Sequence, residues 1–265
     1  MLKSWKQHYI ARVGIFLIAI ALMVGVLGCD GYTLDHFKCY AATPETTPYV
    51  GEVVYLEDQF GAVNATVAAN TTVEEWPWPL FFCNPVEKVH NGVTTPISNP
   101  DHHLTVYNLN YTVEPRMWEV GVHNQFGTQY LTVWGPVALA IPTQKVAPGN
   151  HKPPVGLDHF LLYCVVEGPS VDVTVDMNDQ FREGTDVSVY WPIAFANPVQ
   201  KTHDGEVTEI QNPEAHLVFY EISAEFWEGL EVQVVNQFGE QTFNLFQDPV
   251  IFAVPSKKRY YDPIS

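Results

Sequence analysis

The chain has 265 residues, and 30 Asp and Glu against 13 Lys and Arg give it a formal net charge of −17. Apolar residues make up 46% of the chain and charged residues only 16%. This composition supplies a sizeable core and excludes a disordered acidic tail. The acidic balance also argues against a nucleic-acid binder, because neutralising phosphates requires a surplus of Lys and Arg, whereas acids outnumber them here by 30 to 13.

Residues 1–28 predict a targeting segment. Lys3, Lys6 and Arg12 precede an uncharged apolar run of 16 residues, 13–28. The run is short for a membrane span, which needs about 20 residues, and typical of a signal-peptide core. It ends in VLGC at Cys29, which resembles the lipobox of bacterial lipoproteins. The resemblance implies cleavage before Cys29 and a diacylglycerol on its thiol. An ordinary secretory signal or an uncleaved anchor is the alternative.

The targeting segment predicts where the protein resides. If Cys29 is lipidated, the protein is anchored to a membrane of the cell envelope on its extracytoplasmic side; if the lipobox interpretation fails, it is secreted. Removal of 1–28 takes away three cations and no acids. An acidic surface is repelled by anionic headgroups, so attachment would depend on the lipid alone.

The rest of the chain is duplicated. PLFFCNPVEK at 79–88 returns as PIAFANPVQK at 192–201, and NQFG at 124–127 returns at 236–239. The offset is 112–113 residues from Trp78 onward and 121–123 before it, which places an insertion of about eight residues between Phe60 and Trp78. We therefore predict two homologous domains, 33–145 and 157–259, a Pro/Gly linker at 146–156 and a tail at 260–265.

Each copy is itself doubled, so the chain consists of four quarters with one skeleton. A His leads a short strand, an Asp/Asn-Gln-Phe turn follows, and Pro-x-x-Lys ends the quarter. The four histidines are His36, His103, His159 and His216, the turns start at Asp58, Asn124, Asp179 and Asn236, and the lysines are Lys88, Lys145, Lys201 and Lys258. Because these histidines recur in every quarter, we predict hydrogen bonding at strand entry rather than catalysis.

Period-2 alternation predicts an all-β fold. Valines alternate before each Gln-Phe, as in the run 171–175, and no sustained 3.6-residue stripe occurs. Asn91-Gly92 and Asp204-Gly205 are dipeptides typical of two-residue hairpin turns. With three strands per quarter, each domain is expected to be a β-sandwich or small barrel with an internal pseudo-twofold repeat.

The repeats predict one disulfide. Cys39 and Cys83 occur together in the first quarter, and the same two positions hold Val106/Ala140, Leu162/Ala196 and Phe219/Ala253 in the others. Paired presence and paired loss indicate two buried positions in contact, so we predict a Cys39–Cys83 bond. Cys164 has no counterpart and is expected to be a small buried hydrophobe.

Few residues suggest chemistry. No nucleophile motif or phosphate loop occurs, so we predict no catalytic residue, no cofactor and no metal. The remaining weak metal candidates are Asp101, His102 and His103. The Asp/Asn-Gln-Phe elements are interpreted as turns in which the Asx side chain bonds its own backbone, rather than as calcium loops.

The insertion supplies the candidate binding residues. It is interpreted as a loop starting at Ala62 and contains Asn64 and Asn70, each in an Asn-x-Thr sequence, with Trp76 beside it. Trp78 and Trp191 are equivalent in the two copies and are therefore expected in the core.

Together the motifs DQFG, NPVxK, NPxxHL and NQFG resemble an uncharacterised family of tandem β-domains in secreted and envelope proteins of bacteria. The resemblance covers 33–258 and implies a fold without an assigned activity. We predict a non-enzymatic, lipid-anchored envelope protein that binds or assembles with an envelope protein or glycan. An extracytoplasmic hydrolase or carbohydrate-active enzyme and a purely structural surface or stalk component are the alternatives.

Overall fold

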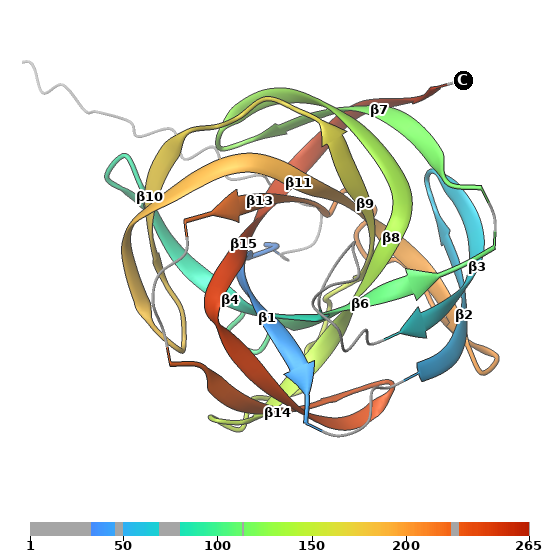
Figure 1. Ribbon diagram of the computed structural model, residues 1–265, viewed down its shortest axis with the longest axis horizontal. Coiled ribbons are helices and arrows are strands. Elements are labelled where there is room, and N and C mark those ends of the chain that lie inside the picture. The colour runs from blue at the N-terminus through green and yellow to red at the C-terminus, as the bar shows by residue number, and fades with distance from the viewer. Residues whose placement is uncertain (1–32, 46–49, 69–79, 113, 224–227, 265) are drawn as a thin grey trace, which may run out of the picture.

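The computed structural model describes residues 33–45, 50–68, 80–112, 114–223 and 228–264 (Figure 1). All regular structure in this part of the chain is β, which confirms the predicted all-β class. No helix among these residues is long and apolar enough to cross a membrane. The strands are β1 (His36–Pro44), β2 (Val50–Asp58), β3 (Gly61–Ala68), β4 (Leu80–His90), β5 (Val93–Thr95), β6 (His103–Asn110), β7 (Arg116–Asn124), β8 (Gly127–Ala147), β9 (His159–Glu167), β10 (Val173–Asn178), β11 (Glu183–His203), β12 (Glu206–Thr208), β13 (His216–Ile222), β14 (Leu230–Asn236) and β15 (Gly239–Ile264).

Eight antiparallel strands form a closed ring at the centre of the molecule. The order is β1–β4–β6–β8–β9–β11–β13–β15, and β15 pairs again with β1. At the closing seam Phe37 lies opposite Ala253. Each quarter contributes two neighbouring strands, so both copies of the duplication share one ring, which surrounds the centre of the view in Figure 1.

Apolar side chains fill the inside of the ring. Large residues such as Phe160 and Phe219 lie opposite small ones, Ala140 and Ala253, on neighbouring strands. Pairing large with small residues is how a narrow cylinder of strands is packed without voids. A gap inside the ring, lined by Cys39, Phe81, Val106, Leu162, Phe219 and Ile251, has no room for a water molecule. The ring is therefore a core and not a channel.

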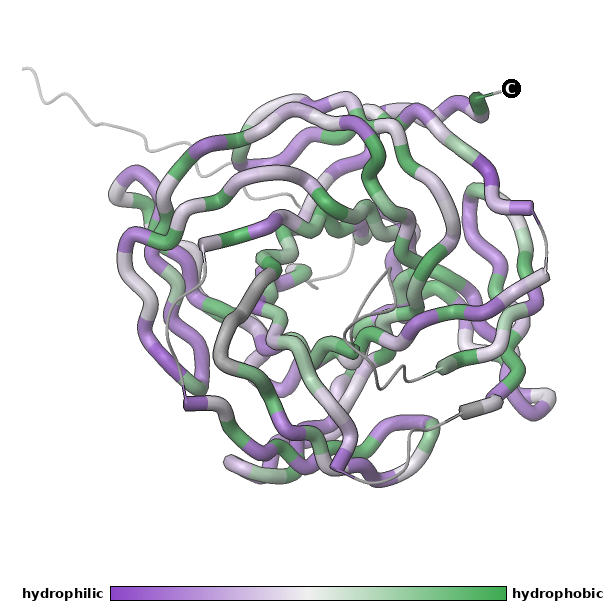
Figure 2. Tube along the Cα trace, in the orientation of Figure 1, coloured by the Kyte–Doolittle hydropathy of each residue, from purple (hydrophilic) through white to green (hydrophobic). Residues whose placement is uncertain are grey.

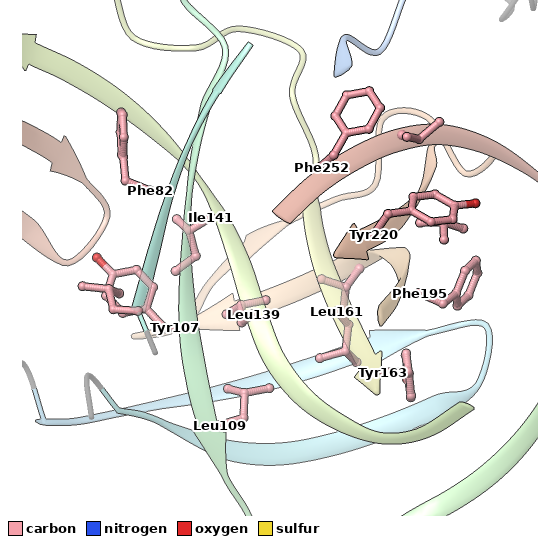
Figure 3. Close-up of a cluster of buried hydrophobic side chains, with 14 of the residues drawn as sticks. Phe82, Tyr107, Leu109, Leu139, Ile141, Leu161, Tyr163, Phe195, Tyr220 and Phe252 are labelled. Atoms are coloured by element: carbon pink, nitrogen blue, oxygen red, sulfur yellow. The ribbon is translucent and has the colours of Figure 1, made fainter. Parts of the chain in front are cut away.

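Four hairpins cover the outside of the ring, and a second core lies between the two layers. They are β2–β3, β7 with the start of β8, β10 with the start of β11, and β14 with the start of β15. Apolar and polar residues alternate along these strands in Figure 2, as expected for one buried face. Figure 3 shows the ring's outward side chains in this core, including Tyr107, Leu139, Leu161 and Phe252.

Each hairpin also pairs with the end of a ring strand that belongs to the opposite quarter of the chain. β2 of the first quarter pairs with the end of β11 in the third, and β10 of the third pairs with the end of β4 in the first. β7 pairs with the end of β15, and β14 with the end of β8, in the same way. Opposite quarters are therefore interlocked by backbone hydrogen bonds.

The predicted disulfide is confirmed. Cys39 on β1 and Cys83 on β4 lie directly opposite each other inside the ring and are bonded. The equivalent residues of the other quarters are also direct cross-strand partners: Val106 with Ala140, Leu162 with Ala196, and Phe219 with Ala253. Cys164 is free and half-buried against the ring core.

The loop predicted to start at Ala62 is wrong in its first part, because residues 61–68 form strand β3. Val63, Ala65 and Val67 alternate along this segment and are buried, which is the period-2 pattern of a strand with one face in the core. Asn70 of the insertion, Trp76 beside it and Trp78, the equivalent of Trp191, lie outside the described residues.

Trp191 was expected in the core, and this expectation is also wrong: its side chain is 54% exposed. Trp191 lies on β11 where the pairing with β13 shifts register, between Val189 and Pro192. Such an irregularity changes which face of the sheet a side chain points to, so the alternation that would bury Trp191 is interrupted.

Candidate functional site

The four Asp/Asn-Gln-Phe elements are the turns of the four hairpins, as predicted. The backbone N–H of Phe60 donates to Asp58 Oδ1 over 2.8 Å. The other three turns repeat this bond over 2.9 Å, from Phe126 to Asn124, from Phe181 to Asp179, and from Phe238 to Asn236. A side-chain acceptor two residues before the donor fixes the turn without help from the rest of the chain.

Each turn also contacts the opposite quarter through the second atom of its Asx side chain. Tyr163 Oη–H and Asn197 Nδ2–H donate to Asp58 Oδ2 over 3.0 and 2.9 Å. Tyr40 and Asn84 donate to Asp179 Oδ2 over 2.7 and 3.3 Å in the same arrangement. Burial raises the pKa of Asp58, and these donors counteract the rise.

The two turns that begin with Asn meet different partners. Asn124 Nδ2 donates to Tyr220 Oη over 2.8 Å and to Ser256 Oγ over 3.0 Å. Asn236 donates likewise to Tyr107 Oη over 2.9 Å. A carboxylate can only accept, so it faces an amide donor, whereas an amide N–H faces hydroxyl oxygens. The choice between Asp and Asn at this position therefore follows from the opposite quarter.

Two of the recurrent histidines, His36 and His159, and two of the recurrent lysines, Lys88 and Lys145, bond to the glutamine of the next quarter's turn. His36 Nε2–H donates to Gln125 Oε1 over 3.0 Å, and Lys88 Nζ donates to the same oxygen. His159 donates to Gln237 over 3.1 Å. Burial, with the nearby Lys88 charge, lowers the pKa of His36 to about 3, so this imidazole is neutral at physiological pH. These contacts match the predicted strand-entry role.

The weak metal candidates do not converge on a common point. Asp101 Oδ1 accepts from His151 Nδ1 over 3.0 Å, and His102 Nε2 donates to the Val155 carbonyl over 2.9 Å. His103 is fully buried and stacks on Phe82, with 5.5 Å between the ring centroids.

Another group does bring metal-binding side chains together. Among the described residues, Glu52, His203 and Asp204 have ligand atoms that all lie within 4.8 Å of one another. Sequence reasoning missed this group because Glu52 and His203 are 151 residues apart. One sequence difference could have indicated the group. The residue after the histidine is an acid, Asp204, in the second copy and an amide, Asn91, in the first.

One copy-specific surface contains the binding candidate Asn64. On the outer side of the β2–β3 hairpin, Asn64 is exposed and pairs across the strands with Tyr55. Tyr55 is 40% and Val53 63% exposed. We call Val53, Tyr55, Glu57 and Asn64 the β2–β3 face. The second copy carries Thr174 and Asp176 in place of Val53 and Tyr55, so the exposed apolar side chains belong to the first copy only.

Comparison with known proteins identifies a family for this chain and no protein of known function. Comparison with curated proteins and with solved structures returned no match. One family model does match, from just before β7 into β15, and the matched segment includes the predicted linker. Because this segment, residues 113–254, is just over half of the chain, the chain belongs to the family described as "Repeat of unknown function (DUF7450)".

Proposed function

We propose that this protein is a lipid-anchored component of the cell envelope that binds a partner protein through the β2–β3 face and has no catalytic role. The observation that carries the proposal is the division between shared and copy-specific residues. The polar motif common to the quarters makes internal contacts, whereas the β2–β3 face presents side chains that only one copy has.

The shared residues are poorly placed for catalysis. A catalytic site needs two or three polar groups that converge where a substrate can reach them. Here His36 and His159 are bonded to glutamines and lie with the lysines under the hairpin turns. These groups stabilise contacts between quarters, which supports a structural role for the shared residues rather than a catalytic one.

The β2–β3 face favours a protein partner over a glycan. Val53 and Tyr55 are neighbouring exposed apolar side chains, and aromatic residues of this kind are enriched in protein interfaces. Thr174 is the exposed equivalent of Val53 in the second copy and lacks this apolar character.

The predicted anchor would orient the ring on the membrane. The Thr33 carbonyl accepts a 3.1 Å hydrogen bond from Asn99 Nδ2, beside the entry of β6. Cys29 precedes Thr33 by four residues, which span at most about 14 Å when extended. The end of the ring near Thr33 would therefore face the bilayer. The Cys39–Cys83 bond is consistent with an oxidising extracytoplasmic compartment.

The test is affinity capture from crosslinked, detergent-solubilised envelopes of the source cells. Wild type is compared with a variant carrying the second-copy residues, Val53→Thr with Tyr55→Asp, and with Thr174→Ala as the matched control. We expect recovery of one partner protein to fall at least tenfold in the first variant and to stay unchanged in the control. Mass spectrometry of the same preparation should find an acylated N-terminal Cys29. Unchanged recovery, glycan capture instead of protein, or an intact residue 1 would contradict the proposal.

A further inference from the structure

We propose that Glu52, His203 and Asp204 form a binding site for a divalent metal ion with a preference for nitrogen and oxygen ligands, of which Zn²⁺ is the probe of choice. One imidazole and two carboxylates are ligands that Zn²⁺ accepts, with solvent completing the coordination.

The distances between the three side chains suit an ion. His203 Nε2 lies 2.7 Å from Glu52 Oε2 and 3.8 Å from Asp204 Oδ2. Ligand atoms that sit about 2.0–2.2 Å from a tetrahedral zinc are roughly 3.4 Å apart. The two observed distances lie on either side of this value, so small rotations of exposed carboxylates suffice. The ion would replace the hydrogen bond between His203 and Glu52.

The backbone holds the three residues in place and leaves the two carboxylates open to solvent. Asp204 is the first residue of the turn between β11 and β12, with φ of 50°. Glu52 follows a bulge in β2, at which the pairing with β3 changes register. The His203 ring packs edge-on against Phe238, with 5.4 Å between centroids. The Asp204 side chain is 84% exposed, so an ion can enter from solution.

The equivalent position in the other copy keeps the histidine and lacks both acids, so the histidine and the acids can be explained separately. There His90 packs edge-on against Phe126, as His203 does against Phe238. Packing therefore accounts for a histidine in both places. The positions of Glu52 and Asp204, however, are taken by Val173 and Asn91, which cannot bind a cation as a carboxylate does. The two acids are specific to one place and need a specific explanation, which metal binding supplies.

The direct test is isothermal titration of the full-length protein with ZnCl₂ in detergent, after treatment with EDTA and without a polyhistidine tag. We expect one equivalent of zinc to bind to wild type. His203→Ala should abolish this binding, and Asp204→Asn should weaken it at least tenfold. His90→Ala is the matched control and should bind like wild type. Thermal unfolding in EDTA checks that each variant is folded.

A transplanted site gives an independent result. Val173→Glu combined with Asn91→Asp recreates the three residues around His90 and should raise the stoichiometry from one zinc to two. Equal zinc binding by wild type and His203→Ala, or no zinc binding by wild type at millimolar metal, would overturn the assignment. A folded double variant that still binds only one zinc would contradict it as well.

Discussion

Asp58 and Asn124 occupy the same turn position, and each side chain matches the partner that it meets. Asp58 accepts from Asn197, whereas Asn124 donates to Ser256. The sequence shows that Asp and Asn both occur at this position, but it does not show the reason. The partners are 139 and 132 residues away, and no local pattern links them. Sequence analysis therefore predicted the turns and missed the contacts between opposite quarters.

The buried histidines predict a loss of stability in acid. The pKa values of His36, His159 and His216 are lowered to about 3 in the folded protein, chiefly by burial, against an ordinary value of 6.5. The unfolded chain therefore binds more protons between pH 6.5 and pH 3, so stability falls as the pH falls. Each histidine contributes about 1.4 kcal/mol per pH unit within this window.

Urea unfolding at pH 7.0 and pH 5.5 measures this effect above the range in which most carboxylates titrate. We expect the free energy of unfolding to be several kcal/mol lower at pH 5.5. His159→Gln should reduce the difference, and His123→Gln, which changes an exposed histidine, should not. Equal stability at the two pH values would show that the histidines are not held neutral by burial.

Comparison of the repeats correctly predicted one contact between strands, that of Cys39 on β1 with Cys83 on β4. Because four equivalent cross-strand pairs face the ring interior, the replacement of two cysteines by an apolar residue and an alanine revealed their contact. The same reasoning failed for Trp191, since a local register shift exposes it. It also missed β3, which was assigned to the insertion although it pairs with β2 as the start of β11 pairs with β10 in the second copy. Repeat comparison thus recovers the residue pairs that the quarters share, and it is less reliable where a register shift or an insertion interrupts the repeat.

The contribution of the β1–β4 disulfide to stability can be measured against an equivalent pair in the same protein that has no bond. Cys39→Val with Cys83→Ala installs the Val106/Ala140 pair of the second quarter and retains the packing without the bond. The bond spans 44 residues of sequence, and closing a loop of this length contributes about 4 kcal/mol.

We expect the double variant to unfold at a correspondingly lower urea concentration, and reduction of wild type with dithiothreitol to give the same midpoint. Cys164→Ala, which removes the free cysteine, should leave the response to the reductant unchanged. A double variant as stable as the oxidised wild type would refute the contribution of the bond.

At the scale of the whole molecule, the closed ring is the feature that sequence patterns could not indicate. Alternation and turn dipeptides locate strands, but they do not say that β15 returns to pair with β1, or that β8 of one copy pairs with β9 of the next. The hairpins add backbone pairing between opposite quarters. Every quarter therefore depends on the other three, and surface residues such as Tyr55 and Asp204 remain free to differ between copies.

The central claim is that the two copies form one ring, and splitting the chain between them tests it most directly. Fragments 33–150 and 151–265 are produced separately under oxidising conditions, and their folding is followed by near-ultraviolet circular dichroism and urea titration. Each fragment alone should lack a cooperative transition, because half of the ring has two open edges. Mixed at equal concentration, the fragments should form a 1:1 complex that unfolds in one transition. Two fragments that each unfold cooperatively and do not associate would contradict the account.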